Sequence, residues 1–170
     1  LNDFAVLVRL NAQTPYLEQQ LIARGLPYRV SQPFYARAEI ITLINYCRLA
    51  WGERHLRSGQ LFTKSQLQQF NDAWADVCNR PKRYITRELR EQIARAVPAL
   101  QQPLSGILQQ AAFSVERESL AEDLEELAEV IEWLSTQLDQ PAQDVLRELD
   151  TRLAYQTFLR DNSGFPQTGE

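Results

Sequence analysis

The sequence predicts a mainly α-helical protein that opens with a small N-terminal parallel βαβ element. Five consecutive apolar residues, Phe4–Val8, precede a helix signal and a second short apolar run, which is the order of a βαβ unit. From Ala36 onward the apolar residues recur at helical spacing instead. The clearest case is Ser119–Leu138, where a leucine-rich stripe faces a row of carboxylates.

The βαβ prediction rests on residues 4–30. The run Phe4–Leu10 is typical of a strand that is buried on both faces, as in a parallel sheet. Thr14 and Pro15 suit the N-cap and the first turn of a helix, and Gly25 suits its C-terminal end. Pro27–Val30 then reads as a second strand. Because the chain starts within the first strand and without a Met, we interpret this element as the edge of a larger α/β domain.

The rest of the chain is predicted to be helical, with loops over residues 52–63 and 98–103 and after residue 161. Ser119 and Glu122 have the spacing of a capping box, in which each side chain bonds the other residue's backbone N–H. The expected helices are Ala36–Trp51, Ser65–Cys78, Arg87–Val97, Leu104–Phe113, Ser119–Leu138 and Pro141–Arg160.

Composition places the chain among ordinary globular proteins. It has 170 residues, of which 44% are hydrophobic and 24% charged, enough for one domain or one domain plus a fragment. No apolar run approaches the ~20 residues that span a bilayer, and no signal peptide is visible. Cys47 and Cys78 lie among apolar neighbours in helical segments, so we expect buried free thiols and a reducing, cytoplasmic location.

Charge is unevenly distributed along the chain. Residues 1–100 carry 14 Lys and Arg against 8 Asp and Glu, a balance of +6, whereas residues 101–170 carry 4 against 14, a balance of −10. A basic surface attracts a polyanion because neutralised phosphates release their counterions. We therefore expect any nucleic-acid contact within the first hundred residues.

Motifs for autonomous catalysis are missing. The sequence holds no G-x-x-x-x-G-K-[ST] phosphate loop, no dinucleotide fingerprint and no H-E-x-x-H. His55 is the single histidine, so neither a zinc site nor a Ser or Cys nucleophile with a histidine base is expected. The chain itself does not look like an enzyme, and we predict no catalytic, cofactor-binding or metal-binding residues in it.

The tip of the first predicted strand is the first candidate binding feature. Arg9 and Asn11 would lie at the carboxyl end of a parallel strand, where open α/β sheets bind ligands. A guanidinium suits phosphate, and an amide can bond a sugar or a base edge. Alternatively, Asn11 is only a turn residue that caps the helix after it.

Three segments resemble one family, the superfamily 1 DNA helicases of the UvrD/PcrA/Rep type. Residues 4–30, FAVLVRLNAQTPYLEQQLIARGLPYRV, look like the second motor domain, with its Arg-x-Asn-Ala-Gln tip. Residues 34–40, FYARAEI, are similar to the F-[FY]-x-R-x-E-[IV] that opens the inserted domain called 2B. Residues 79–85, NRPKRYI, resemble the N-x-P-x-R-G-I-G turn that contacts duplex DNA. The resemblance covers about residues 3–95.

The resemblance implies a division of the chain and a set of DNA contacts. Residues 1–33 would be the edge of motor domain 2A, and residues 34–170 most of domain 2B, truncated at its C-terminus. Arg9 and Asn11 match positions on the single-strand track, and Lys82 and Arg83 match the duplex-contacting turn. Arg87 is a further candidate contact, supported by the basic balance of residues 1–100. The sequence departs from the family where Gly-Ile-Gly becomes Tyr84-Ile85-Thr86, which disfavours close backbone contact with a phosphate.

By the same resemblance, the parent protein would be an ATP-dependent 3′ to 5′ DNA helicase that uses ATP and Mg²⁺. This chain would supply DNA contacts and a swivelling regulatory domain, without ATPase activity. The alternative is a non-catalytic helical interaction module with no DNA role, which would use the acidic helix Ser119–Leu138 and the N-terminal strand. Lys82, Arg83 and Arg87 would then form only a solvated basic turn, and the exposed strand would favour dimerisation.

Overall fold

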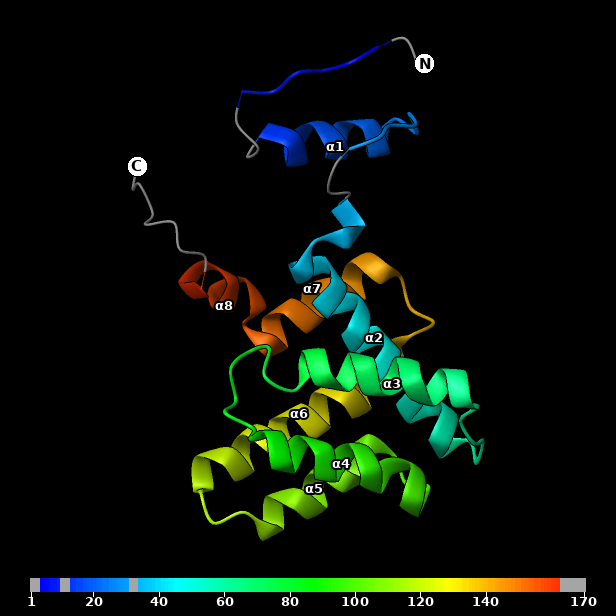
Figure 1. The fold of residues 1–170 in the computed structure, drawn as a ribbon, viewed down its shortest axis with the longest axis vertical. Coiled ribbons are helices and arrows are strands. Elements are labelled where there is room, and N and C mark those ends of the chain that lie inside the picture. The colour runs from blue at the N-terminus through cyan, green and yellow to red at the C-terminus, as the bar shows by residue number, and fades with distance from the viewer. Residues whose placement is uncertain (1–3, 10–12, 31–33, 163–170) are drawn as a thin grey trace. The chain divides into compact units, whose positions relative to one another are not determined.

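Helices dominate the computed structural model, which describes residues 4–9, 13–30 and 34–162 (Figure 1). None of these residues is in a β-strand. The helices in chain order are α1 (Thr14–Ala23), the short 3₁₀ helix η2 (Phe34–Ala36), α2 (Ala38–Arg57), α3 (Lys64–Val77), α4 (Arg87–Leu100), α5 (Leu104–Ser114), α6 (Glu118–Gln137), α7 (Ala142–Leu153) and α8 (Tyr155–Asn162).

The predicted βαβ element is wrong, because its helix forms but its two strands do not. Residues 4–9 and 26–30 have no strand assignment. A strand needs a neighbour that takes up its backbone hydrogen bonds, and no described segment pairs with either run. The apolar run that we expected to be buried is on the surface, where Phe4 and Leu7 are 82% and 94% exposed.

The chain divides into two compact units, residues 1–41 and 42–170. In the first unit, α1 has Gln13 rather than Thr14 as its N-cap, with Pro15 in its first turn. Gly25 follows the helix with φ +63°, a left-handed conformation that favours glycine, as its predicted role at the C-terminal end requires. The buried carboxylate of Glu18 in α1 forms an ion pair with Arg37. The predicted division of the chain at residues 33/34 stays a prediction.

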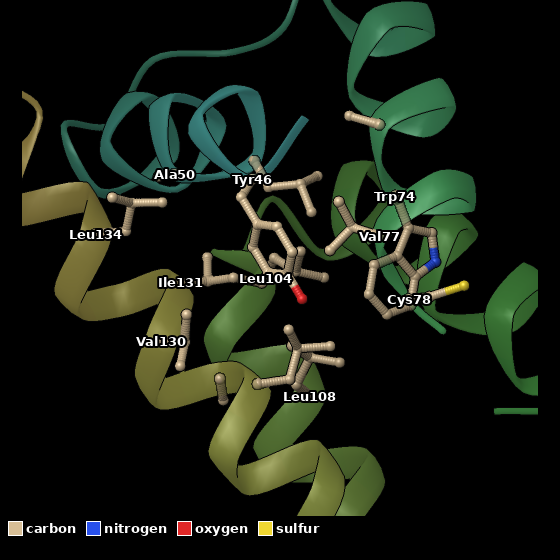
Figure 2. Packing of buried hydrophobic residues seen from close by; sticks show 14 of the residues in the cluster. Tyr46, Ala50, Trp74, Val77, Cys78, Leu104, Leu108, Val130, Ile131 and Leu134 are labelled. Atoms are coloured by element: carbon tan, nitrogen blue, oxygen red, sulfur yellow. The ribbon is translucent and has the colours of Figure 1, made fainter. Parts of the chain in front are cut away.

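The second unit is a helical assembly built on one apolar core. Along it, α5 packs against α6, α4 against α5, α3 against α4, and α7 against both α6 and α8. Figure 2 shows side chains from α2, α3, α5 and α6 meeting in this core. They include Tyr46 and Ala50 from α2, Trp74 and Val77 from α3, Leu104 and Leu108 from α5, and Val130, Ile131 and Leu134 from α6. The leucine-rich stripe predicted for Ser119–Leu138 is therefore a core face, as expected.

A buried carboxylate ties three helices of this unit together. Glu53 in α2 is fully buried. Its carboxylate accepts hydrogen bonds from Ser105 at the start of α5, from the backbone N–H at 3.1 Å and from the Ser105 hydroxyl. Arg57 pairs with Glu53 at 2.8 Å and with Glu132 of α6 at 2.9 Å. The hydrogen bond to Glu53 is the main cause that raises the pKa of Arg57. Burial of the Glu53 charge is thus compensated by three donors.

Helix α2 runs six residues further than predicted, through Gly52 to Arg57. Gly52 is needed here for a close approach of side chains rather than for a turn, since a Cβ at this position would lie 2.8 Å from Phe70 Cδ2. The ring of His55 stacks against those of Trp51 and Phe62, at centroid distances of 4.7 and 5.6 Å, and these two rings also contact each other at 6.4 Å. This explains the lone histidine as part of an aromatic stack.

Several helix ends also differ from the sequence prediction. The capping box of Ser119 does not form, because α6 begins one residue earlier at Glu118 with Arg117 as its N-cap. A capping box does form between Thr63 and Gln66 at the start of α3. The single helix predicted over Pro141–Arg160 is two helices, separated where Ala154 adopts a left-handed φ of +46°.

Cys47 and Cys78 are free thiols, with Cys78 buried and Cys47 partly buried. Burial raises the pKa of both thiols above the ordinary value. Among the described residues, no helix combines the length and apolarity that crossing a bilayer requires.

Candidate nucleic-acid interface

The segment between α3 and α4, residues 79–86, is a tight turn held by its own first residue. Asn79 donates from Nδ2 to the carbonyl of Ile85 and accepts from the N–H of Ile85 at Oδ1, both at 2.9 Å. The Arg80–Pro81 peptide bond is cis. Thr86 then caps α4, its hydroxyl accepting from the N–H of Leu89. The two bonds between Asn79 and Ile85 close the turn through a side chain, where a β-hairpin would use backbone hydrogen bonds.

Arg83 lies on the inner side of this turn. It is only 7% exposed, and its Nη1 donates to the carbonyls of Val77 and Pro81, at 3.4 and 3.2 Å. Its Nη2 donates to the hydroxyl of Tyr46 at 3.1 Å. That hydroxyl in turn donates to the carbonyl of Arg80 at 2.7 Å. In this structure Arg83 therefore supports the turn, and a contact with phosphate would require it to leave these partners.

Tyr46 connects the turn to the core. Its ring is fully buried among the side chains of α3, α5 and α6. Burial raises the pKa of its hydroxyl, and the nearby Arg83 opposes this with a smaller effect. The hydroxyl is therefore neutral at physiological pH and able to donate to Arg80 while accepting from Arg83.

A polar network fixes the first half of the turn to α2. Arg80 pairs with Asp76 at 2.8 Å and donates to the hydroxyl of Thr42 at 3.2 Å. Asp76 also accepts from Thr42 at 3.0 Å and from Asn45 at 2.9 Å. Thr42 and Asn45 are both buried, so their polar groups need these partners. The backbone of the turn is thus held from two sides.

The outer side of the turn presents a small group of cations around one aromatic ring. Tyr84 is 60% exposed, with the ammonium of Lys82 4.7 Å from its ring centroid. The guanidinium of Arg117, just before α6, lies 5.8 Å from the same centroid, and it also donates to the carbonyl of Arg83 at 3.4 Å. We call Lys82, Tyr84 and Arg117 the tip. Two cations near an exposed ring can attract phosphates and bases together.

Arg87, the remaining residue predicted at this turn, is the first residue of α4 and is exposed. It pairs with Glu91 at 2.8 Å, one helical turn along. The hydrogen bond between them raises the pKa of Arg87 and lowers that of Glu91. Because the carboxylate partly neutralises it, Arg87 is a weaker attractor for phosphate than Lys82.

The two residues predicted on the single-strand track belong to the first compact unit. Arg9 is exposed. Asn11 lies outside the described residues, so its role stays a prediction. The tip, in the second unit, is the candidate site for which the structure gives side-chain contacts.

Two members of the tip were not among the predicted site residues. Tyr84 stood out in the sequence only as a departure from Gly-Ile-Gly, and its φ of +56° shows that the position still has a glycine-like backbone. Arg117 belongs to the acidic part of the chain, where we expected no nucleic-acid contact. The sequence does mark Arg117 in one way, since it is one of only four Lys and Arg residues among residues 101–170.

Comparison with known families shows to which family the chain belongs. The family model described as the UvrD-like helicase C-terminal domain matches residues 1–144, which include the whole turn and the tip. The chain belongs to the UvrD-like helicase family. No curated protein matches it. Membership of the UvrD-like helicases supports helicase function and DNA binding at the level of the family.

Helicase function implies ATP and Mg²⁺. Among residues 4–9, 13–30 and 34–162, no three His, Cys, Asp or Glu side chains gather as a metal ion would require. The full sequence has no phosphate loop. That this UvrD-like chain holds neither ATP nor Mg²⁺ stays a prediction from its sequence.

Proposed function

We propose that this chain is a DNA-contacting part of an ATP-dependent DNA helicase that moves 3′ to 5′. Residues 1–33 would belong to the margin of the second motor domain 2A, and residues 34–170 to the inserted domain 2B. The observation that carries the proposal is an exposed cationic tip on a rigid buried support, within the region that matches the UvrD-like family. ATP hydrolysis would take place on other parts of the helicase.

The tip is the part of the second unit best suited to a DNA phosphate backbone. Lys82 is exposed, and its support by the ring of Tyr84 leaves its ammonium donors free to turn to an oxygen ligand. Arg117 adds a second charge from a distant part of the sequence. In this proposal the predicted role of Arg83 changes from phosphate contact to support of the turn, and Arg87 is a secondary contact.

Salt dependence of DNA binding tests this function. The probe is a duplex with a single-stranded tail, labelled for fluorescence anisotropy and titrated with the chain at several salt concentrations. The slope of log K against log salt falls by about 0.9 for each duplex phosphate that the protein no longer neutralises. Lys82→Ala and Arg117→Ala should each lower the slope by about that amount. Arg147→Ala, an exposed arginine of α7 that pairs with Asp144, is the matched control and should leave the slope unchanged.

Two outcomes would contradict the proposal. Binding that does not depend on salt, or that Lys82→Ala and Arg117→Ala do not alter, would remove the DNA role of the tip. ATP hydrolysis by the purified chain that single-stranded DNA stimulates would contradict the absence of an ATPase site.

The second candidate, a protein-interaction module without a DNA role, has one observation in its favour. The face of α6 opposite the core is exposed and acidic, through Glu122, Glu125, Glu126 and Glu129. Such a face repels DNA and suits a basic protein partner. The same salt titration separates the two candidates, because a module of this kind would not bind the tailed duplex.

In the intact helicase, we propose that residues 34–170 swivel about their connection near Phe34 and so regulate unwinding. The support for this step is the resemblance of residues 34–40 to the segment that opens domain 2B. Fluorophores placed in both domains of the full-length helicase would show a change in energy transfer when tailed DNA binds. An unchanged transfer efficiency would contradict the swivel.

A further inference from the structure

We propose that Tyr84 is a stacking platform for an unpaired nucleobase beside the end of the DNA duplex, with Lys82 and Arg117 holding the flanking phosphates. This inference rests on the proposed function and adds to it the part of the DNA that the tip would recognise.

The position of Tyr84 is the first observation. Both of its chain neighbours are buried, Arg83 at 7% and Ile85 at 5% exposure, whereas Tyr84 itself is 60% exposed. Its ring therefore projects outward from a backbone that is fixed on both sides. The backbone clamp of Asn79 on Ile85 and the bond of Arg83 to Tyr46 hold that geometry without any ligand. A platform of this kind loses little conformational freedom when a base stacks on it.

The backbone conformation is the second observation. Tyr84 has φ +56°, in the left-handed region that disfavours any residue with a Cβ. A glycine here would relieve this cost and would fit the turn equally well. The structure instead holds a large aromatic ring at this position and leaves it on the surface, and no packing role in the core accounts for the ring.

The neighbouring charges are the third observation. The ammonium of Lys82 and the guanidinium of Arg117 lie 4.7 and 5.8 Å from the Tyr84 ring centroid. Aromatic rings flanked by cations bind single-stranded nucleic acid because bases stack on the ring while the cations neutralise the backbone. Stacked base pairs inside a duplex cannot present a face to the ring, whereas an unpaired base can. The chemistry of the tip therefore favours an unpaired base.

The experiment compares two changes that remove the same interaction from opposite sides. On the protein side, Tyr84→Gly removes the ring and suits the backbone, and Tyr84→Phe keeps the ring. On the DNA side, the probe is a tailed duplex in which each unpaired position next to the duplex is replaced in turn by an abasic residue. Affinities come from fluorescence anisotropy at one fixed salt concentration, because salt alters the phosphate contacts. Thermal unfolding of each variant confirms that the turn is folded.

If Tyr84 stacks on a base, Tyr84→Gly should weaken binding to the intact tailed duplex by about tenfold, as expected for one base–aromatic stack. Tyr84→Phe should bind within about twofold of the parent chain, since the ring face remains. At one tail position the abasic residue should weaken the parent chain by a similar factor, and it should not weaken the Tyr84→Gly variant further.

The results that would overturn the inference differ from those that would overturn the proposed function. If Tyr84→Gly binds as well as the parent chain, or loses affinity equally for intact and abasic DNA at every position, Tyr84 does not stack on a base. The salt-dependent effects of Lys82→Ala and Arg117→Ala could persist in that case, and the DNA role of the tip would stand. If the parent chain does not bind the tailed duplex at all, the proposed function itself fails.

Discussion

The guanidinium of Arg83 donates to the hydroxyl of Tyr46 at 3.1 Å, which joins the turn between α3 and α4 to a side chain buried at the centre of the core. Arg83→Ala removes this bond, so that the buried hydroxyl of Tyr46 loses its donor, and it also removes the bonds to the carbonyls of Val77 and Pro81. We expect the free energy of unfolding to fall by about 1–3 kcal/mol, measured by urea denaturation.

Matched variants show whether this loss belongs to the Arg83–Tyr46 pair. Arg87→Ala, at an exposed arginine of the same region, should change stability by less than about 0.5 kcal/mol. In a double-mutant cycle, Tyr46→Phe and Arg83→Ala should together cost less than the sum of the two single changes. Strict additivity would show that the hydrogen bond contributes nothing of its own.

Lys82 and Arg83 are adjacent in the sequence but should separate in function. Lys82→Ala should reduce DNA affinity and the salt slope while the unfolding midpoint stays unchanged, since its side chain is exposed. Arg83→Ala should lower the midpoint. In the fraction that remains folded, it should leave the salt slope unchanged. The two measurements are anisotropy at several salt concentrations and thermal unfolding. An equal effect of both variants on the slope would restore Arg83 as a phosphate contact.

The difference between Lys82 and Arg83 also shows what the sequence could not reveal. Both are basic residues in one turn, and their chemistry alone makes each a candidate for phosphate. The side that each faces depends on Tyr46, which lies 37 residues from Arg83 in the chain. Arg117 likewise reaches the tip from 34 residues beyond Arg83. Tertiary contacts of this separation leave no local pattern in a single sequence.

Local patterns did predict the helices of the second unit, because apolar residues at helical spacing mark the face of a helix that packs against the core. Leu124, Leu127 and Ile131 are all fully buried, as their spacing indicated. The N-terminal run Phe4–Val8 has an equally clear strand pattern, but a strand forms only against a partner. No described segment supplies that partner, so the same kind of reasoning failed there.

The left-handed backbone of Tyr84 predicts an unusual preference for glycine over alanine. At φ +56°, Tyr84→Gly should be more stable than Tyr84→Ala by about 1 kcal/mol, because alanine retains the Cβ clash. Thermal unfolding of both variants measures the difference. Gln92, an exposed position inside α4, is the control and should show the reverse order, with alanine better than glycine by about 1 kcal/mol. The same order at both positions would mean that Tyr84 is not held in this conformation.

Two helical glycines should respond to alanine in opposite directions. At Gly52 a new Cβ would lie 2.8 Å from Phe70 and 3.1 Å from Phe62, so Gly52→Ala should destabilise the chain by about 1–3 kcal/mol. At Gly106 in α5 the new Cβ would extend into open space, so Gly106→Ala should stabilise the chain by about 0.5–1 kcal/mol. Urea denaturation of both variants checks the signs. A neutral Gly52→Ala would indicate that the aromatic stack moves aside at little cost.

Alkaline pH should destabilise the fold through its two thiols. Burial raises the pKa of Cys47 and Cys78 above the ordinary value of 9.0, and the protonated form is the neutral one. Above the unfolded pKa, the unfolded chain releases protons that the folded chain retains. The titration of these thiols should therefore not change the free energy of unfolding below about pH 8. As pH rises through and beyond their unfolded pKa, the free energy of unfolding should fall, in total by about 1.4 kcal/mol for each pKa unit by which folding raises the pKa of a thiol. Tyr46, also raised by burial from 10.0, adds to the fall at still higher pH.

The variant that isolates the thiols is the double change Cys47→Ala/Cys78→Ala. Truncation of the two side chains lowers stability by an amount that does not depend on pH, whereas their titration is removed altogether. Plotted against pH between 7 and roughly 10.5, the unfolding free energies of the parent chain and the variant should run parallel at first and converge above about pH 8.5. Curves that remain parallel throughout would mean that the thiols ionise as readily in the folded chain as in the unfolded one.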